Sequence, residues 1–174
     1  AAVNDKPVIT SGTTATVAEN AAVSTVVYTA TATDVDVGDT RTFSLSGADA
    51  ASFNIDSATG VVTLKASADY ETKASYSINV VATDKAGLTA TKAVAVSVVN
   101  VDEAPVITAA ATKTIAVNED SSATFVIDAT DVDTAASLLT ASIVTAPAHG
   151  TISVNSAGEN VYTPTANYNG TDSF

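Results

Sequence analysis

Two adjacent acids, Asp102 and Glu103, stand between a long apolar run and the dipeptide Ala104-Pro105. Proline fixes its own φ and pushes the residue before it toward extended geometry, so this segment is expected to leave one β-domain and enter the next without turning back. Two carboxylates in a short extended joint repel each other unless a cation compensates them. The arrangement therefore suggests that calcium binds at this joint, with further ligands from the domains on both sides.

Calcium takes six to eight oxygen ligands at roughly 2.3–2.6 Å, from carboxylates, backbone carbonyls and water. No single loop of this sequence supplies that many oxygens, and no EF-hand pattern of spaced acids, glycine and a terminal Glu is present. The oxygens would have to converge from separate loops at one end of a sandwich. The Asp-x-Asp pairs at 34–36 and 131–133 are candidates, although ordinary turn chemistry also explains such a pair because Asp caps its own backbone.

The elements that must position these acids are organised as an internal repeat. Three motifs recur in the same order at offsets of 98, 100 and 97 residues: proline at Pro7 and Pro105, Val-x-Glu at Glu19 and Glu119, and Ala-Thr-Asp-Val-Asp at 32–36 and 129–133. The repeat predicts two tandem domains, residues 5–101 and 102–174. The second domain is expected to be incomplete at its C-terminal end, because it lacks most of its last two strands.

Short β-rich runs separated by polar or glycine-containing turns fill the first repeat. Strands are expected at 14–18, 25–32, 41–45, 53–55, 61–64 and 76–82, and in a last strand whose Val94, Val96 and Val98 face inward. Gly60 ends a five-residue hairpin loop at a position where positive φ is expected. Seven short antiparallel strands of this kind predict an all-β fold, an immunoglobulin-like Greek-key sandwich.

The second repeat begins in the same way and then departs from the first. Strands are expected at 112–117, 124–127, 137–144 and 151–154, followed by a strand at 161–164 that Pro164 ends. A missing strand leaves an open sheet edge, which invites pairing with another chain or fraying.

Composition excludes several classes of function. Nineteen acidic and seven basic residues give a net charge of −12, which argues against nucleic-acid or anionic-membrane binding. The chain has no Cys and one His, His149 in a predicted turn, so no enzyme is predicted. No apolar run is long enough to span a bilayer and no signal peptide opens the chain, so we expect an internal piece of a larger protein without membrane insertion of its own.

Several motifs of the first repeat resemble those of cadherin repeats. They are Val-x-Glu-Asn at 17–20, Ala-x-Asp-x-Asp at 32–36, Phe-x-Ile-Asp-x-x-Thr-Gly at 53–60, Asp-Tyr-Glu at 69–71 and Tyr-x-Ile-x-Val-x-Ala-x-Asp at 76–84. The linker resembles the bacterial form that ends in Asp-Glu-Ala-Pro. The second repeat is similar to the bacterial cadherin-like repeats of large secreted adhesins, through Val-Asn-Glu-Asp at 117–120, Pro-Ala-His-Gly-Thr at 147–151, Tyr-Thr-Pro at 162–164 and the segment 167–174.

The resemblance implies two sets of calcium ligands. The set at the joint consists of Glu19, Asp69 and Glu71 from the first repeat, Asp102 and Glu103 from the linker, and Asp131 and Asp133 from the second repeat. A corresponding half-site at the N-terminal end consists of Asp5, Asp34, Asp36 and Asp84. Asp69 and Glu71 are the most specific pair, because acids two residues apart point to one side of an extended chain. Val99 stands where eukaryotic cadherins usually have Asp, so we expect fewer or weaker ions than the full pattern would hold.

The resemblance also implies a function. It predicts calcium-binding repeats of a large extracellular protein of the bacterial surface or secreted type, in which calcium makes the joint rigid and supports adhesion to like repeats or to a host surface. A passive spacer rod is one alternative. A carbohydrate-binding module that recognises a polysaccharide is another, and it would need an exposed aromatic platform, which the sequence does not reveal.

Overall fold

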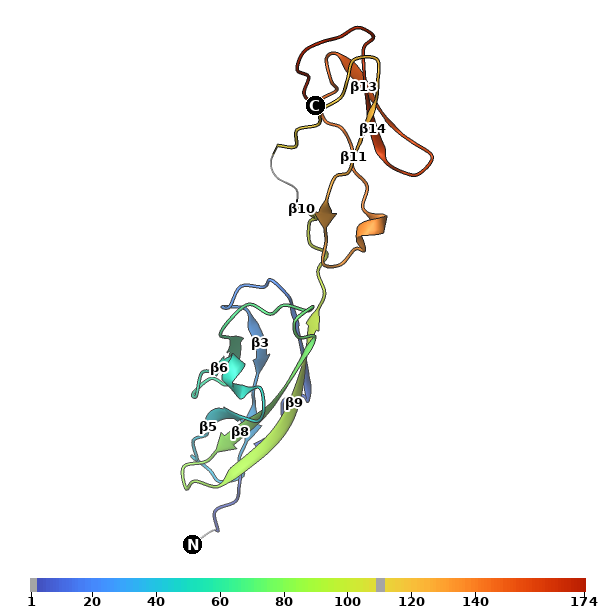
Figure 1. Ribbon diagram of the computed structural model, residues 1–174. Coiled ribbons are helices and arrows are strands. Elements are labelled where there is room, and N and C mark those ends of the chain that lie inside the picture. The colour runs from blue at the N-terminus through green and yellow to red at the C-terminus, as the bar shows by residue number, and fades with distance from the viewer. Residues whose placement is uncertain (1–2, 109–111) are drawn as a thin grey trace. The chain divides into compact units, whose positions relative to one another are not determined.

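The computed structural model describes residues 3–108 and 112–174. The chain divides into two compact units, unit 1 (Ala1–Val101) and unit 2 (Asp102–Phe174). Both units are built from β-strands, and the described helices are two single 3₁₀ turns, Ala50–Ser52 and Ala136–Leu138 (Figure 1). None of the described helices has the length and apolar character needed to cross a membrane.

Unit 1 is a sandwich of two sheets. The strands are β1 (Val8–Ile9), β2 (Thr14–Ala18), β3 (Val26–Thr29), β4 (Ala32–Thr33), β5 (Thr42–Ser46), β6 (Phe53–Ile55), β7 (Val61–Leu64), β8 (Ser75–Thr83) and β9 (Thr89–Val99). One sheet has the order β2-β9-β8-β5 and the other has the order β3-β7-β6, while β1 pairs with β4. The all-β sandwich expected from the strand pattern is confirmed.

The core of unit 1 lies between these two sheets and depends most on the long hairpin β8–β9. Alternation along β8 buries Ile78, Val80 and Ala82 completely, each with 0% of its surface exposed. The inward valines of β9 are buried as the alternation predicts. Burial of each Ile or Val side chain stabilises the fold by roughly 1.5–3 kcal/mol, so this hairpin contributes much of the stability of the sandwich.

One pairing in unit 1 differs from the expectation of antiparallel strands. β2 and β9 are parallel, with Thr14 opposite Ala95 and Ala18 opposite Val99. β2 lies near the start of the unit and β9 runs to its end, and the chain enters and leaves unit 1 at opposite ends (Figure 1). Both strands therefore run in the same direction. Side-chain alternation shows which face of a strand is buried but not which way its neighbour runs, so the sequence pattern could not reveal this pairing.

Local turn signals are confirmed by the backbone. Gly60 has φ +73° and closes the loop between β6 and β7, and its carbonyl accepts a hydrogen bond from the N–H of Ala30 at 2.8 Å. The expected strand 25–32 is divided into β3, which pairs with β7, and β4, which pairs with β1, so the chain changes its pairing partner between Thr29 and Ala32.

Unit 2 repeats part of unit 1. Its strands are β10 (Val106–Ile107), β11 (Ala123–Phe125), β12 (Ala129–Thr130), β13 (Gly150–Val154) and β14 (Asn160–Pro164). β10 pairs with β12 as β1 pairs with β4, and the sheet β11-β14-β13 has the same order as β3-β7-β6. The sequence repeat is therefore also a structural repeat.

Two strands expected in unit 2 are wrong. Residues 112–117 form no strand, and residues 137–144 begin in the 3₁₀ turn Ala136–Leu138 and continue without strand structure. Their counterparts in unit 1, β2 and β5, are held by hydrogen bonds to β9 and β8. Unit 2 contains no paired strands equivalent to β8 and β9 among its described residues, so these two segments lack the ladder partners that their counterparts have in unit 1.

Candidate metal centres

Three carboxylates converge at the end of unit 1 where β2 and β9 finish. Glu19, Asp69 and Glu71 each place a carboxylate oxygen within 4.8 Å of the others. Glu19 directly follows β2, and Asp69 and Glu71 lie 50 and 52 residues further along the chain, just ahead of β8. The structure thus brings together the three acids that the sequence predicted from the first repeat.

Glu19 is the buried member of this cluster, with 3% of its surface exposed. One carboxylate oxygen accepts a hydrogen bond from the N–H of Val101 at 2.7 Å, and the other accepts one from the N–H of Tyr70 at 2.8 Å. The next residue, Asn20, has φ +57°, which turns the chain away directly after the acid. The side chain is therefore fixed by backbone donors from both neighbouring segments, and charge-assisted bonds of this kind are the strong ones.

The two exposed acids of the cluster lie in a turn and not on an extended chain, so that part of the prediction is wrong. The N–H of Thr72 donates to the Asp69 carboxylate at 2.7 Å, and the N–H of Lys73 donates to the Asp69 carbonyl at 2.9 Å. Glu71 accepts a hydrogen bond from the Asn100 side-chain amide at 3.2 Å. The hydrogen bond from Tyr70 to Glu19 and the bonds to Asp69 hold this turn, and the turn places both acids beside Glu19. Strand alternation is therefore not what brings these acids together.

A second acidic cluster lies at the opposite end of unit 1. Asp34, Asp39 and Asp84 each place an oxygen within 4.8 Å of the others. Asp39 was missed by the sequence analysis, although its signal was present as a third acid in the loop that contains Asp34 and Asp36. Asp5 and Asp36 adjoin this trio, since the N–H of Asp5 donates to Asp36 at 2.8 Å and the N–H of Asp36 donates to Asp34 at 2.9 Å.

The carboxylate of Asp84 is buried and well supplied with donors. It accepts hydrogen bonds from the Asn4 side chain and from the N–H of Leu88, both at 2.8 Å. Burial alone would raise the pKa of Asp84, but the hydrogen bonds from Asn4, Leu88 and the turn residues before Leu88 outweigh it, so the pKa lies below its ordinary value. The second acidic cluster therefore contains an acid that stays charged.

One oxygen in the second cluster has no donor. Oδ2 of Asp34 is buried and has no hydrogen-bond partner among the described residues. A buried carboxylate oxygen without a partner is unfavourable, and a bound cation would satisfy it. An adjoining hollow of about 470 Å³ is lined in part by Asp36 and Asp39, and also by Lys85. The three carboxylates of Asp34, Asp39 and Asp84, one of them with an unpaired oxygen, are suitable ligands for a hard cation.

Unit 2 begins with the same arrangement of acids. The N–H of Glu103 donates to Asp133 at 2.9 Å, and the N–H of Asp133 donates to Asp131 at 2.9 Å. These bonds reproduce those among Asp5, Asp36 and Asp34 atom for atom. Asp102, the remaining predicted ligand, is exposed at the start of unit 2. The seven acids predicted for the joint therefore belong to two structural groups, three in unit 1 and four in unit 2.

The other end of unit 2 has the same positive φ as the Glu19 region at the corresponding position, but it lacks two of the three acids. Asp120 has φ +61°, as Asn20 has φ +57° one repeat earlier. Asn167 and Asn169 stand 98 residues after Asp69 and Glu71 and replace both acids by amides. Glu119 is exposed, whereas Glu19 is buried. This end of unit 2 is therefore a much poorer cation site.

Comparison with known proteins agrees with this architecture. The structure is similar to the crystal structure of human protocadherin-24 EC1-2, with a TM-score of 0.68 and 23% sequence identity, covering 97% of this chain and 82% of that chain. It is also similar to the extracellular cadherin domains 1-4 of protocadherin gamma B7, with a TM-score of 0.53 and 23% identity, covering 92% of this chain and 41% of that chain. Mouse PcdhgC3 EC1-3 is 30% identical over 54% of this chain and 33% of its own length, with a TM-score of 0.50.

Family models match the two units separately. Residues 102–174 match the model described as a bacterial Ig domain. Residues 13–102, more than half of the chain, match the model described as the cadherin domain. Together with the sandwich fold and the ordered acidic motifs, this match shows that the chain belongs to the cadherin domain family.

Proposed function

We propose that this chain is a calcium-binding structural module of an extracellular adhesion protein, and that calcium is held by the acidic clusters at the ends of its units. The observation that carries the proposal is the convergence of Glu19, Asp69 and Glu71 oxygens within 4.8 Å. At about 4 Å, two like charges repel by about 1 kcal/mol in water and by about 4 kcal/mol at an effective dielectric constant of 20. Lys73, the nearest base in sequence, is paired with Asp49 instead.

The ligand chemistry favours calcium over other metals. The clusters offer carboxylate oxygens. The chain has no Cys, and its single His, His149, belongs to neither three-acid cluster. Oxygen-only sites suit calcium, magnesium and manganese, whereas zinc and copper prefer nitrogen and sulfur ligands. Several carboxylates from separate loops in an irregular arrangement suit the flexible coordination of calcium better than the strict octahedron of magnesium.

We propose further that calcium restricts the hinge between the two units. Glu19 holds the N–H of Val101, and only Asp102 separates Val101 from Glu103, which is bonded to Asp133. The short peptide 101–103 therefore connects two acidic clusters along the chain. An ion that takes ligands from both clusters binds best when the hinge is aligned, so by linkage its binding stabilises that alignment.

A measurement of self-association distinguishes an adhesive module from a passive spacer. If the chain mediates homophilic adhesion, calcium should shift its sedimentation toward a dimer. If it is a spacer, calcium should leave it monomeric but stiffer. We propose the adhesive role because the chain belongs to the cadherin family, and no catalytic role is proposed for it.

A calcium titration tests the proposal. Melting temperature and scattering-derived length are measured with EDTA and with increasing calcium on the parent chain, on Asp69→Ala and on Asp102→Ala. Both quantities should rise with calcium in the parent, and Asp69→Ala should blunt both increases. Asp102→Ala should affect length more than melting. Glu119→Gln is the matched control, because this acid is the exposed repeat partner of Glu19. A parent chain that is equally long and stable in EDTA and in saturating calcium contradicts the proposal.

A further inference from the structure

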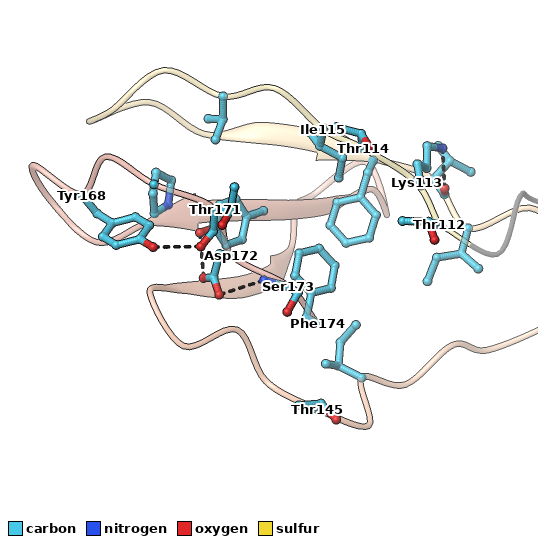
Figure 2. Close-up of a pocket in the computed structure, with 18 of the residues that line it drawn as sticks. Thr112, Lys113, Thr114, Ile115, Thr145, Tyr168, Thr171, Asp172, Ser173 and Phe174 are labelled. Atoms are coloured by element: carbon cyan, nitrogen blue, oxygen red, sulfur yellow. Dashed lines mark hydrogen bonds between the residues drawn. The ribbon is translucent and has the colours of Figure 1, made fainter.

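The dipeptide Asn169-Gly170 lies in the loop after β14, among the residues that line the pocket drawn in Figure 2. It is the only Asn-Gly pair in the sequence, and both of its residues are exposed. Asparagine followed by glycine is the pair most prone to lose its side-chain amide spontaneously. Glycine has no Cβ to shield its backbone nitrogen, and its backbone reaches the required conformation at little cost.

The two groups that would react are not restrained in the described structure. The side-chain amide of Asn169 makes no hydrogen bond among the described contacts, and the N–H of Gly170 donates none. The carboxamide can therefore rotate until its carbon meets the nitrogen of Gly170. A neutral amide without a partner loses no hydrogen bond when it turns in this way.

The packing of the loop favours glycine at position 170. The Tyr168 hydroxyl donates to the carbonyl of Thr171 at 2.8 Å, so this side chain reaches across the dipeptide (Figure 2). A Cβ on residue 170 would lie 2.7 Å from the Tyr168 hydroxyl oxygen. The ring is held in place because it also stacks on His149, with centroids 4.1 Å apart. The same contacts that shape the loop therefore keep the reactive pair intact.

A second asparagine of unit 2 has the opposite surroundings. Asn155 precedes Ser156, which is also a small residue. Its Oδ1 accepts hydrogen bonds from the N–H of Ala157 at 3.0 Å and of Glu159 at 2.9 Å. Its Nδ2 donates to the Glu159 carboxylate at 2.8 Å. These three bonds fix the carboxamide of Asn155 and oppose the rotation that an attack by the next nitrogen requires.

We propose that Asn169-Gly170 is a site of spontaneous deamidation, which modifies unit 2 as the protein ages. The backbone nitrogen of Gly170 attacks Cγ of Asn169. The new N–Cγ bond replaces the Cγ–Nδ2 bond, and ammonia leaves with the proton of the Gly170 N–H. Solvent water then opens the resulting succinimide at one of its two carbonyls. One opening gives aspartate, and the other gives isoaspartate, whose main chain runs through Cβ and Cγ. Either product carries a new carboxylate that is charged at neutral pH.

Isoaspartate changes the loop beyond its charge. It adds one carbon to the main chain between Tyr168 and Thr171, and the hydrogen bond between these two residues spans that point. The neighbouring Asp172 accepts hydrogen bonds from the N–H groups of Ala148 and His149, which connect this loop to the turn before β13. Isoaspartate at position 169 is therefore expected to release the Tyr168 side chain and to loosen the connection between the loop and that turn.

Ageing of the unmodified chain tests the proposal. The chain is incubated in mildly alkaline buffer, and peptide mass spectrometry follows each asparagine through the gain of about 1 Da that replacement of an amide by a carboxyl group produces. In the folded chain Asn169 should react about tenfold faster than Asn155, because only Asn169 has an unrestrained amide and a following glycine. Unfolding in urea should accelerate Asn155 strongly and change the rate at Asn169 by no more than about twofold, since only Asn155 is held by the folded chain.

Variants separate the two products. Asn169→Asp carries the new charge without the longer main chain, and Asn169→Ser is the matched control that cannot deamidate. The unit 2 transition of aged parent chain that contains isoaspartate should lie several degrees below that of fresh parent chain. Fresh Asn169→Asp should melt close to the fresh parent, and Asn169→Ser should melt at the same temperature before and after ageing.

Three outcomes overturn the proposal. The first is a folded chain in which Asn169 reacts no faster than Asn155. The second is an acceleration of Asn169 by urea as strong as that of Asn155, which would show that the folded loop protects the pair. The third is an equal loss of stability in aged parent and aged Asn169→Ser, which would assign the effect of ageing to another position. The first two measurements use the unmodified chain, so they decide the matter even if a variant fails to fold.

Discussion

The carboxylate of Glu19 accepts a hydrogen bond from the N–H of Val101 at 2.7 Å, across 82 positions of sequence. This bond ties the last residue of unit 1 to the acid that directly follows β2. The other oxygen of the same carboxylate holds the turn of Asp69 and Glu71 through the N–H of Tyr70. Glu19 therefore organises the cluster structurally, besides being a candidate ligand.

Glu19→Gln should destabilise unit 1 even without calcium. The amide NH₂ of Gln cannot accept a hydrogen bond, so either Val101 or Tyr70 loses its acceptor. Both hydrogen bonds are part-buried, and the loss of one hydrogen bond to a charged group costs about 1.5–3 kcal/mol in the free energy of unfolding. Urea denaturation in EDTA measures this value. Glu119→Gln, at the exposed repeat position, should stay within about 0.5 kcal/mol of the parent, and equal losses in the two variants would argue against the anchoring role of Glu19.

Calcium should stabilise the chain in proportion to site occupancy. At a free calcium concentration 100 times the dissociation constant, one site adds about 2.7 kcal/mol to the free energy of unfolding. For a unit of this size that corresponds to a rise of at least several degrees in melting temperature. Calorimetric scans at stepped calcium concentrations measure the rise. Magnesium at the same concentration is the control, and it should produce a smaller shift because it demands a stricter geometry.

Asp34→Asn should act in opposite directions with and without calcium. The orphaned oxygen Oδ2 lies in a cluster with Asp39 and Asp84, and an amide there can donate to a neighbouring carboxylate. In EDTA the variant should gain about 1 kcal/mol, the net value of one hydrogen bond. In calcium it should bind one ion fewer, which isothermal titration calorimetry would measure. A variant that loses stability in EDTA and keeps its full calcium stoichiometry would contradict a cation site here.

Gly60→Ala should strongly destabilise unit 1. A Cβ at this position would lie 2.3 Å from the carbonyl oxygen of Ala30, and the residue has φ +73°. Left-handed strain of about 1 kcal/mol and an overpacking penalty of about 1–3 kcal/mol give a loss of roughly 2–4 kcal/mol. Gly87→Ala is the matched control, because Gly87 has φ +92° but open space around its Cβ, so only the strain applies. Chemical denaturation of both variants separates the two effects.

Unit 2 should lose stability in acid through Asp172. Burial alone would raise the pKa of Asp172, but hydrogen bonds from the N–H groups of His149, Ser173 and Ala148 and from the Tyr162 hydroxyl outweigh it and lower the pKa. Because the folded-state pKa lies below the unfolded value of about 3.9, the stabilisation is complete well above pH 3.9 and is lost as pH falls through the folded pKa.

Melting curves between pH 6 and pH 2.5 measure this loss. Asp172→Asn should reduce the stability of unit 2 at pH 6 and flatten its dependence on pH below 5. A slope in the variant as steep as that of the parent would mean that other acids are responsible.

The sequence by itself indicated the all-β fold class, the internal repeat and most of the acids that form the two three-acid clusters of unit 1. Alternation identified β8 and the inward face of β9, because the side-chain period of a strand can be read directly from the residues. Gly60 predicted the turn between β6 and β7, because a left-handed backbone conformation favours glycine. The motifs that contain Glu19, Asp34 and Asp131 indicated candidate ligands through their resemblance to the motifs of cadherin repeats.

The tertiary structure alone decided which of these local signals had partners. Strands were predicted at 112–117 and 137–144, but a strand forms only when a neighbour supplies the hydrogen-bond ladder, and no local sequence pattern shows whether a neighbour is present. The parallel pairing of β2 with β9, the turn that brings Asp69 to Glu19, and the entry of Asp39 into the second cluster all depend on contacts between distant segments. Periodicity fixes which way a side chain faces, whereas only the packed chain decides what it faces.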